Sequence, residues 1–266
     1  MFRSFTLVAG PCVLEDDRLN LRVASSLAEW AAAWGIPVIF KASFDKANRS
    51  RLESPRGPGL EAGLEALRRV KDATGIPVLT DVHEAAQAGP AAEVADVLQV
   101  PAFLCRQTDL LLAVGATGRA VNIKKGQWMA PEEMAGAVEK VRSGGASSTA
   151  VTERGTFLGY GDLVVDMRSF ERIGAACGVP CLFDGTHSVQ RPGASPHGTG
   201  GDPRHTPALV RAAVAAGCDG LFLEVHPDPG SAPSDGANML ELNALPRLMD
   251  QVLSIRAALS REEVAS

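Results

Sequence analysis

The chain has 266 residues, of which 45% are hydrophobic and 21% charged, and its formal net charge is -5. It is long enough to bury the core of one large α/β barrel or of two small domains. An acidic chain lacks the basic face that nucleic acids and anionic membrane surfaces bind, so we expect neither as a partner.

The cysteines and the start of the chain indicate the compartment. Five scattered cysteines, an odd number, favour reduced thiols over a disulfide framework. The first ten residues run directly into a strand-like pattern and lack the organisation of a signal peptide. No apolar run is long enough to span a bilayer. We therefore expect a cytoplasmic protein.

Three segments share a Gly-x-Pro opening, and each lies between an amphipathic stretch and a short apolar run. They begin at Gly35, Gly75 and Gly178. The glycine can adopt the left-handed conformation that ends a helix. The proline that follows is tolerated at the first position of a strand. The recurrence of this pattern predicts repeated β/α units.

Eight apolar runs have the length of a strand. In chain order they are 6–12, 38–43, 78–83, 97–102, 120–125, 149–155, 181–187 and 220–226. Helical patterns lie between them, for example over 60–70, 131–141 and 208–216. This alternation predicts an α/β fold in which residues 1–266 form a single (β/α)8 TIM barrel. An open doubly wound sheet is the alternative, but no G-x-G-x-x-G follows the first run.

One segment, 188–207, is rich in Gly, Pro and Ser, and we expect a long loop without regular structure there. Such loops often form mobile lids over active sites. The segment therefore predicts a lid.

Each predicted strand ends in polar residues. In a β/α barrel these ends converge on one face, which is where such enzymes carry out chemistry. Burying charge there is costly unless it serves a ligand or a partner. The strand ends therefore predict an active site, and its main candidates are Cys12, Lys41, Asp81, Gln99, Lys124, Arg154, His187 and Glu224.

Closure of the barrel makes the seventh, eighth and first strands neighbours. Cys12, His187 and Glu224 then lie side by side, and Asp235 in the following loop can reach them. A thiolate, an imidazole and two carboxylates suit one divalent metal ion, with Zn, Fe(II) and Mn all possible. Taken singly, each residue also has an ordinary structural interpretation, since a lone buried Cys is usually a small hydrophobe. His226 competes with His187 for the ligand role.

Two further groups of residues suit anions. Lys124 and Arg154 on adjacent strands form a cradle for a phosphate or carboxylate, the first anion site. A structural ion pair with Glu153 or a neighbouring carboxylate is the alternative. The segment 41–50 combines three cations with hydroxyl and amide groups, which suits a sugar phosphate and defines the second anion site. A solvated basic loop is the alternative there.

The chain closely resembles the 3-deoxy-D-manno-octulosonate 8-phosphate synthase family. The matching stretches cover nearly the whole chain, and they are 9–12, 40–50, 56–61, 80–84, 99–110, 122–125, 153–155, 163–166, 184–190 and 224–227. The resemblance implies condensation of phosphoenolpyruvate with D-arabinose 5-phosphate and water, with release of phosphate. It also implies a role in lipopolysaccharide synthesis and a homotetramer.

The resemblance assigns the phosphoenolpyruvate contacts first. Lys124 and Arg154, with the backbone near Ala102, would hold its phosphate. Lys46, together with Lys41, would lie near its carboxylate.

The contacts with the sugar follow from the same resemblance. Asn48, Arg49 and Ser50 would hold the aldose phosphate, helped by Arg106 from a neighbouring subunit. Asp81 would meet the sugar hydroxyls.

The family divides into a metal-free group with Asn at the position of Cys12 and a metal-dependent group with Cys, to which this chain is similar. Catalytic roles are expected for His187, Asp235 and Lys46. A metal near the aldehyde oxygen or the attacking water would stabilise the charge that develops in the reaction.

The sequence leaves three alternative functions to consider. A sister synthase that uses erythrose 4-phosphate would carry Pro-Arg-Thr-Ser where this chain has Ala-Asn-Arg-Ser at 47–50. A Schiff-base aldolase would use Lys124 as its nucleophile. A non-catalytic metal or sugar-phosphate sensor lacks support, since no DNA-reading or signalling module is appended.

Overall fold

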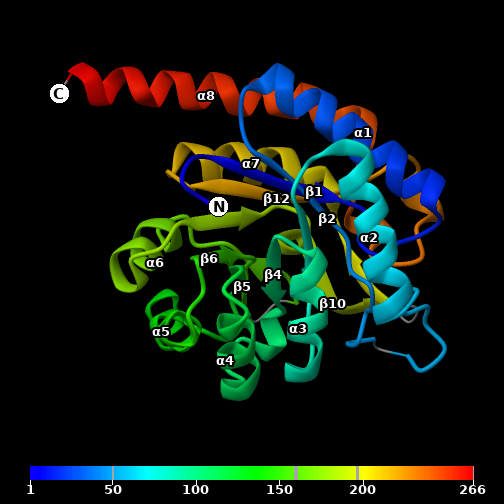
Figure 1. Cartoon of the computed structure of the whole chain (residues 1–266). Helices are drawn as coiled ribbons and strands as arrows, with labels where there is room; N and C mark the ends of the chain where they lie inside the picture. The colour runs from blue at the N-terminus through cyan, green and yellow to red at the C-terminus, as the bar shows by residue number, and fades with distance from the viewer. Residues whose placement is uncertain (50, 159–160, 196–197, 266) are drawn as a thin grey trace.

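The computed structural model describes residues 1–49, 51–158, 161–195 and 198–265. Its centre is a closed barrel of parallel strands surrounded by helices (Figure 1). The barrel strands are β1 (Thr6–Gly10), β2 (Val38–Lys41), β3 (Val78–Asp81), β4 (Val97–Val100), β5 (Ala120–Lys124), β6 (Ser148–Glu153), β9 (Cys181–Asp184) and β12 (Gly220–His226). β12 pairs with β1 and closes the barrel. The predicted (β/α)8 fold is confirmed, with all eight strands in the expected places.

The strands are mostly shorter than predicted because their polar ends leave the hydrogen-bonded ladder. The first strand ends at Gly10, and the seventh at Asp184. Cys12 therefore lies in a bend after β1, and His187 begins a short 3-10 helix (His187–Val189) after β9, so neither is within a strand. Chemistry-bearing side chains in such turns are positioned by the rigid strands below them.

The glycines of the three Gly-x-Pro segments end three helices of the outer layer. Gly35, Gly75 and Gly178 adopt left-handed conformations with φ of 64°, 70° and 60° and cap the helices before them. The main helices are α1 (Asp17–Trp34), α2 (Leu60–Thr74), α3 (Ala85–Val94), α4 (Thr108–Ala116), α5 (Ala135–Gly144), α6 (Ser169–Cys177), α7 (Thr206–Ala215) and α8 (Leu245–Ala265). The helical pattern over 131–141 divides into a 3-10 turn, Pro131–Met134, and the start of α5.

An apolar layer fills the barrel interior below the polar strand ends. It takes one buried residue from each barrel strand, together with Phe2, and comprises Phe2, Val8, Ile39, Leu79, Val97, Ala120, Ala150, Leu182 and Phe222. A larger buried cluster lies between the strands and the helices. Because this apolar layer fills the interior, the polar side chains lie at the carboxyl end of the barrel, as in other barrels of this class.

The segment 188–207 corrects the prediction of a structureless loop. It contains β10 (Gln190–Ser195) and β11 (Gly198–Gly201), which pair antiparallel, followed by a 3-10 turn and the start of α7 at Thr206. Glycine favours this packing at Gly201, where a Cβ would overlap the Asn238 side chain. Composition alone therefore suggested a loop where close backbone packing forms a hairpin.

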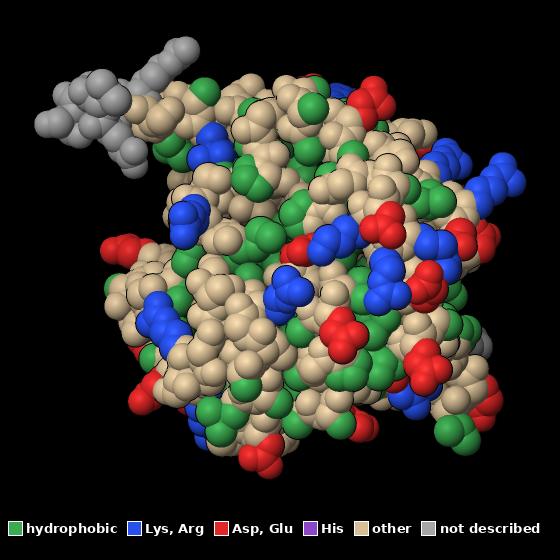
Figure 2. All heavy atoms as spheres, in the orientation of Figure 1, with side chains coloured by type: hydrophobic (Ala, Val, Ile, Leu, Met, Phe, Trp, Pro, Cys, Tyr) green, Lys and Arg blue, Asp and Glu red, His purple; other side chains and the backbone are tan. Residues whose placement is uncertain are grey.

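The surface shows no single dominant charge on the face in view. In Figure 2, Lys and Arg side chains are interspersed with Asp and Glu side chains. Among the described residues, no helix is both long and apolar enough to cross a membrane.

Candidate active site

A cavity of about 840 Å³ lies at the carboxyl end of the barrel. Most of the predicted site residues line it, namely Lys41, Lys46, Asn48, Arg49, Asp81, Gln99, Ala102, Lys124, Arg154, His187, Glu224 and Asp235. Cys12 is fully buried at its edge, Arg106 does not line it, and Ser50 lies outside the described residues.

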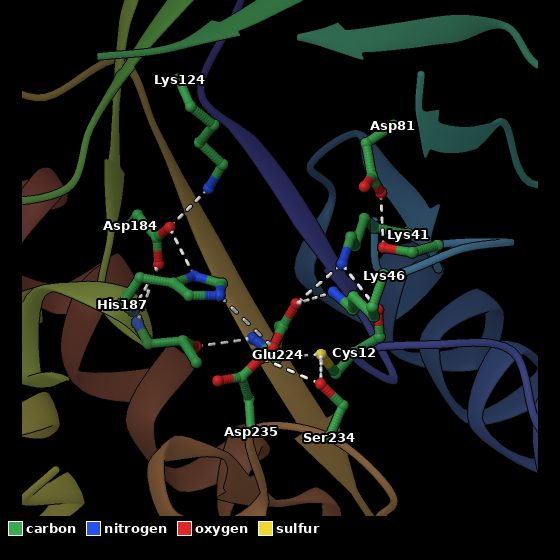
Figure 3. Close-up of polar contacts among 12 residues, drawn as sticks. Cys12, Lys41, Lys46, Asp81, Lys124, Asp184, His187, Glu224, Ser234 and Asp235 are labelled. Carbon is green, nitrogen blue, oxygen red and sulfur yellow. Dashed lines mark hydrogen bonds and ion pairs between the residues drawn. The ribbon is translucent and has the colours of Figure 1, made fainter. Parts of the chain in front are cut away.

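Strand register brings the predicted metal donors together. Gly10 pairs with Glu224 across β1 and β12, so Cys12 emerges beside that carboxylate. Donor atoms of Cys12, Glu224 and Asp235 lie within 4.8 Å of one another, and the Cys12 Sγ is 3.2 Å from Asp235 Oδ2 (Figure 3). His187 falls outside this three-residue cluster, but its Nε2 is 3.8 Å from Glu224 Oε2.

Two observations indicate that this cluster suits a divalent cation. Glu224 Oε2 is buried and has no hydrogen-bond partner among the described residues. Burial, together with the Glu224 carboxylate, raises the pKa of the Cys12 thiol well above its ordinary value. Ionising this thiol beside two carboxylates therefore needs more positive charge than Lys41 and Lys46 provide, and a metal ion would supply it.

Asp184 fixes the orientation of His187. Its Oδ2 lies 2.8 Å from His187 Nδ1, and its Oδ1 accepts the backbone N–H groups of Thr186 and His187. Burial opposes ionisation of Asp184, but His187 and Lys124 outweigh it and hold its pKa well below the usual range. Because an ionised carboxylate only accepts, Nδ1 carries a proton toward Asp184, and Nε2 faces Glu224.

His226 does not compete for the cation. Its Nε2 lies 3.0 Å from Glu15 Oε1, and its Nδ1 accepts the N–H of Asp228. Both ring nitrogens are therefore engaged elsewhere.

Both residues predicted for the first anion site, Lys124 and Arg154, line the cavity, and each is held by its own partner. Lys124 Nζ is 2.5 Å from Asp184 Oδ2 and 3.1 Å from the centre of the Phe222 ring. Burial lowers the pKa of Lys124 to about 8, although Asp184 opposes the shift. The structural ion pair expected as the alternative is present for Lys124, with Asp184 as the neighbouring carboxylate, whereas Glu153 lies 3.5 Å from Lys125.

Arg154 also lines the cavity. Its Nη2 donates to Gln190 Oε1 at 2.5 Å, whereas its buried Nη1 has no partner in the described part of the chain. A buried guanidinium nitrogen without a partner is costly, so the geometry favours an oxyanion ligand at Nη1.

The residues of the second anion site border the cluster of Cys12, Glu224 and Asp235, which we call the cation cluster because these side chains would hold a cation. Lys41 Nζ lies 2.7 Å from Glu224 Oε1, and Lys46 Nζ lies 3.9 Å from the same oxygen. Arg49 donates to Ser234 Oγ at 2.8 Å and to the carbonyl of Pro233 at 2.9 Å. The predicted basic segment is thus folded over the cavity, with Arg49 anchored beside Asp235.

Polar contacts between strands hold the remaining predicted residues. Asp81 Oδ1 accepts from Ser43 Oγ, and its Oδ2 lies 3.0 Å from His83 Nε2. Gln99 Oε1 accepts from Asn122 Nδ2 at 2.9 Å. These contacts limit the rotamers of Asp81 and Gln99 at the cavity floor.

Sequence reasoning missed three residues that organise the site, and they are Asp184, Gln190 and Ser234. Asp184 and Gln190 lie in the matching stretch 184–190, and Ser234 directly precedes Asp235. Their position was visible in the sequence, but the direction of their side chains was not. Ser234 Oγ lies 3.1 Å from both Cys12 Sγ and Asp235 Oδ2.

Comparison with known proteins gives one family. The model of the DAHP synthetase I family matches residues 3–260. A 2-dehydro-3-deoxyphosphooctonate aldolase of Nitratidesulfovibrio vulgaris is 53% identical over 249 residues, which is 94% of this chain and 91% of the relative. Proteins of the same name from a Cyanothece species and from Syntrophotalea carbinolica are each 52% identical, over 96% and 94% of this chain and 93% and 90% of the relatives.

Proposed function

The chain belongs to the DAHP synthetase I family and, within it, to the 2-dehydro-3-deoxyphosphooctonate aldolases, and from this we propose its reaction. It condenses phosphoenolpyruvate with D-arabinose 5-phosphate and water to give 3-deoxy-D-manno-octulosonate 8-phosphate and phosphate. It depends on a divalent metal held by Cys12, His187, Glu224 and Asp235. The cytoplasm and lipopolysaccharide synthesis are the setting that the resemblance implies.

One observation carries this proposal. A single cavity is lined by two groups of cationic residues and by Glu224 and Asp235, which form a cluster of three metal-donor side chains with the buried Cys12. A cavity of about 840 Å³ with this lining supports separate binding of two anionic substrates and one cation.

The chain's own residues account for much of the chemistry. The reaction joins C3 of phosphoenolpyruvate to the aldehyde carbon while water adds at C2, so negative charge grows on the aldehyde oxygen. Lys124 and Arg154 hold the phosphate and stabilise its charge as it leaves. A bound divalent metal supplies Lewis acidity near the aldehyde or the water. His187, Asp235 and Lys46 border the same space, and we assign proton movement to them.

The sugar specificity can be tested directly. Phosphate release is measured with arabinose 5-phosphate and, in parallel, with erythrose 4-phosphate at equal concentrations. We expect the five-carbon sugar to be used at least about tenfold more efficiently, since the two differ in contacts within the second anion site. Preference for erythrose 4-phosphate would instead identify the sister synthase.

A Schiff-base route through Lys124 is the one alternative that a structural observation favours. A lysine with a pKa of about 8 is a better nucleophile than an ordinary lysine. Borohydride with substrate would trap a covalent adduct on that route. We expect no such adduct, because Lys124 is already held by Asp184.

We propose that the protein is a homotetramer in which Arg106 reaches a neighbouring site. Arg106 does not line the cavity of its own chain. Phe103 does line the cavity, and its ring centre lies 5.9 Å from that of Trp128. Phe103 is 53% exposed and Trp128 is 45% exposed. Exposed aromatic side chains at a cavity rim favour a face that another copy covers. Sedimentation of the purified protein gives the oligomer size.

Replacing Arg49 by alanine should raise the Michaelis constant for arabinose 5-phosphate by about tenfold or more, because a charge-assisted phosphate contact is lost. The constant for phosphoenolpyruvate should stay within about twofold. Steady-state kinetics with each substrate varied in turn measures both. Arg68→Ala on the outer surface of α2 is the matched control. Equal effects on the two substrates would contradict the assignment of the second anion site.

The pH dependence should report Lys124. Its pKa of about 8 means that the amine is charged below pH 8 and neutral above it. Only the charged form attracts phosphate, so kcat/KM for phosphoenolpyruvate should fall as pH rises through about 8. Lys124→Arg should move this decline to higher pH, since arginine keeps its proton. A flat profile up to pH 9.5 in the parent enzyme would exclude Lys124 as the titrating group.

A further inference from the structure

Gln190 connects three parts of the site that are far apart in sequence. It is buried at the first position of β10 and pairs with Gly201 at the end of β11. Its Oε1 accepts from Arg154 Nη2 at 2.5 Å, and its Nε2 donates to Asp235 Oδ1 at 3.2 Å. One amide therefore joins the first anion site, the cation cluster and the base of the hairpin.

The bond to Arg154 sets the direction of that side chain. A guanidinium is planar, so fixing Nη2 also fixes where the unpartnered Nη1 points. Arg154 lines the cavity, and Nη1 is its buried free donor. Gln190 thus determines the orientation in which Arg154 meets an anion.

The bond to Asp235 restrains a strained segment. Asp235 has a φ of 50°, in the left-handed region that side chains other than glycine seldom adopt. One carboxylate oxygen is held by Ser234 and Cys12, and the other by Gln190. Close packing of Gly201 against Asn238 attaches the other hairpin strand to the same loop. The hairpin and the Asp235 loop are therefore joined at two points.

We propose that Gln190 is a positioning residue that orients Arg154 for the phosphate of phosphoenolpyruvate and Asp235 for the cation at the same time. It does so by dividing the acceptor and the donor of one amide between the two residues. The inference rests on the proposed function only in taking Arg154 as the phosphate contact and Asp235 as a cation donor.

Two substitutions distinguish the bond that the Gln190 amide accepts from Arg154 from the bond that it donates to Asp235. Gln190→Met keeps the length of the side chain and removes both hydrogen bonds. Gln190→Glu keeps an acceptor for Arg154 but places a second carboxylate against Asp235. Gln251→Met is the matched control, because Gln251 accepts from Arg211 on the outer helices, away from the cavity.

Binding of phosphoenolpyruvate to metal-free protein is measured by calorimetry, and loss of Zn²⁺ to a chromogenic chelator is measured separately. For Gln190→Met we expect phosphoenolpyruvate binding about tenfold weaker and Zn²⁺ loss about tenfold faster. For Gln190→Glu we expect binding within about threefold of the parent, and the same faster loss of Zn²⁺. The control should match the parent in both measurements.

The outcomes separate this inference from the proposed function. A parent protein that binds no phosphoenolpyruvate would contradict the proposed function. A parent that binds and turns over, with a folded Gln190→Met variant unchanged in both measurements, would contradict the role of Gln190 alone. If Gln190→Met does not fold, Gln190→Glu decides: Zn²⁺ loss at the parent's rate overturns the proposal, and faster loss with phosphoenolpyruvate binding retained supports it.

Discussion

Replacing Glu224 by alanine should abolish metal retention and lower turnover by more than about a thousandfold. Glu224 is fully buried and is one of the three clustered donors. Its Oε1 also pairs with the buried Lys41 at 2.7 Å, so the substitution leaves that ammonium without its carboxylate. Such an unpaired buried charge destabilises a fold by about 3–5 kcal/mol. We therefore expect a lower melting temperature as well.

Glu224→Gln distinguishes the loss of a metal donor from the loss of folding. It keeps the volume and one acceptor for Lys41 but removes the negative charge. We expect it to be more stable than Glu224→Ala and equally poor in metal content and turnover. Glu65→Ala, a surface change on α2, is the control. Metal content and kcat are measured on the same preparation, and a Glu224→Ala protein that keeps bound metal and a tenth of parental turnover would contradict the assignment.

Lys124→Met should lower kcat/KM for phosphoenolpyruvate by about a hundredfold to a thousandfold, because a desolvated positive charge beside the leaving phosphate is removed. The Michaelis constant for arabinose 5-phosphate should change little. Asp184 keeps its bonds to His187 and to two backbone N–H groups, so the cation cluster should stay in place.

Lys71→Met is the control for Lys124→Met, since Lys71 pairs with Asp96 on the outside of the barrel. Steady-state kinetics with each substrate varied, and metal content of the variant, are the measurements. An equal loss for both substrates would mean that Lys124 does not belong to a separate phosphoenolpyruvate site.

The fold could be predicted because its signals are local and repeated. The glycines of the Gly-x-Pro openings end their helices in the left-handed conformation, and apolar runs of strand length follow them. The ends of the strands were less well predicted, since the sequence pattern does not show where the polar residues at these ends leave the hydrogen-bonded ladder. The hairpin over 190–201 was missed because its Gly and Pro content is also that of a loop.

The site could be predicted in position but not in orientation. The carboxyl ends of parallel strands must meet, so Cys12, Glu224 and Asp235 could be brought together without a structure. The sequence favoured His187 as the ligand but left His226 as a competitor, because both lie at the ends of predicted strands. The structure distinguishes them through their partners, since Asp184 directs His187 inward and Glu15 engages His226 outside the cluster.

The most direct measurement is phosphate release from phosphoenolpyruvate, with and without arabinose 5-phosphate, in the purified protein, after chelation and after return of a divalent metal. Release is expected only when the sugar phosphate and the metal are both present, because the residues of the two proposed anion sites line one cavity with Glu224 and Asp235, and Cys12 contacts Asp235 at its edge. Chelated protein should be inactive and should recover on addition of metal. Full phosphate release from rigorously metal-free protein, or a rate that does not depend on arabinose 5-phosphate, would contradict the proposed reaction.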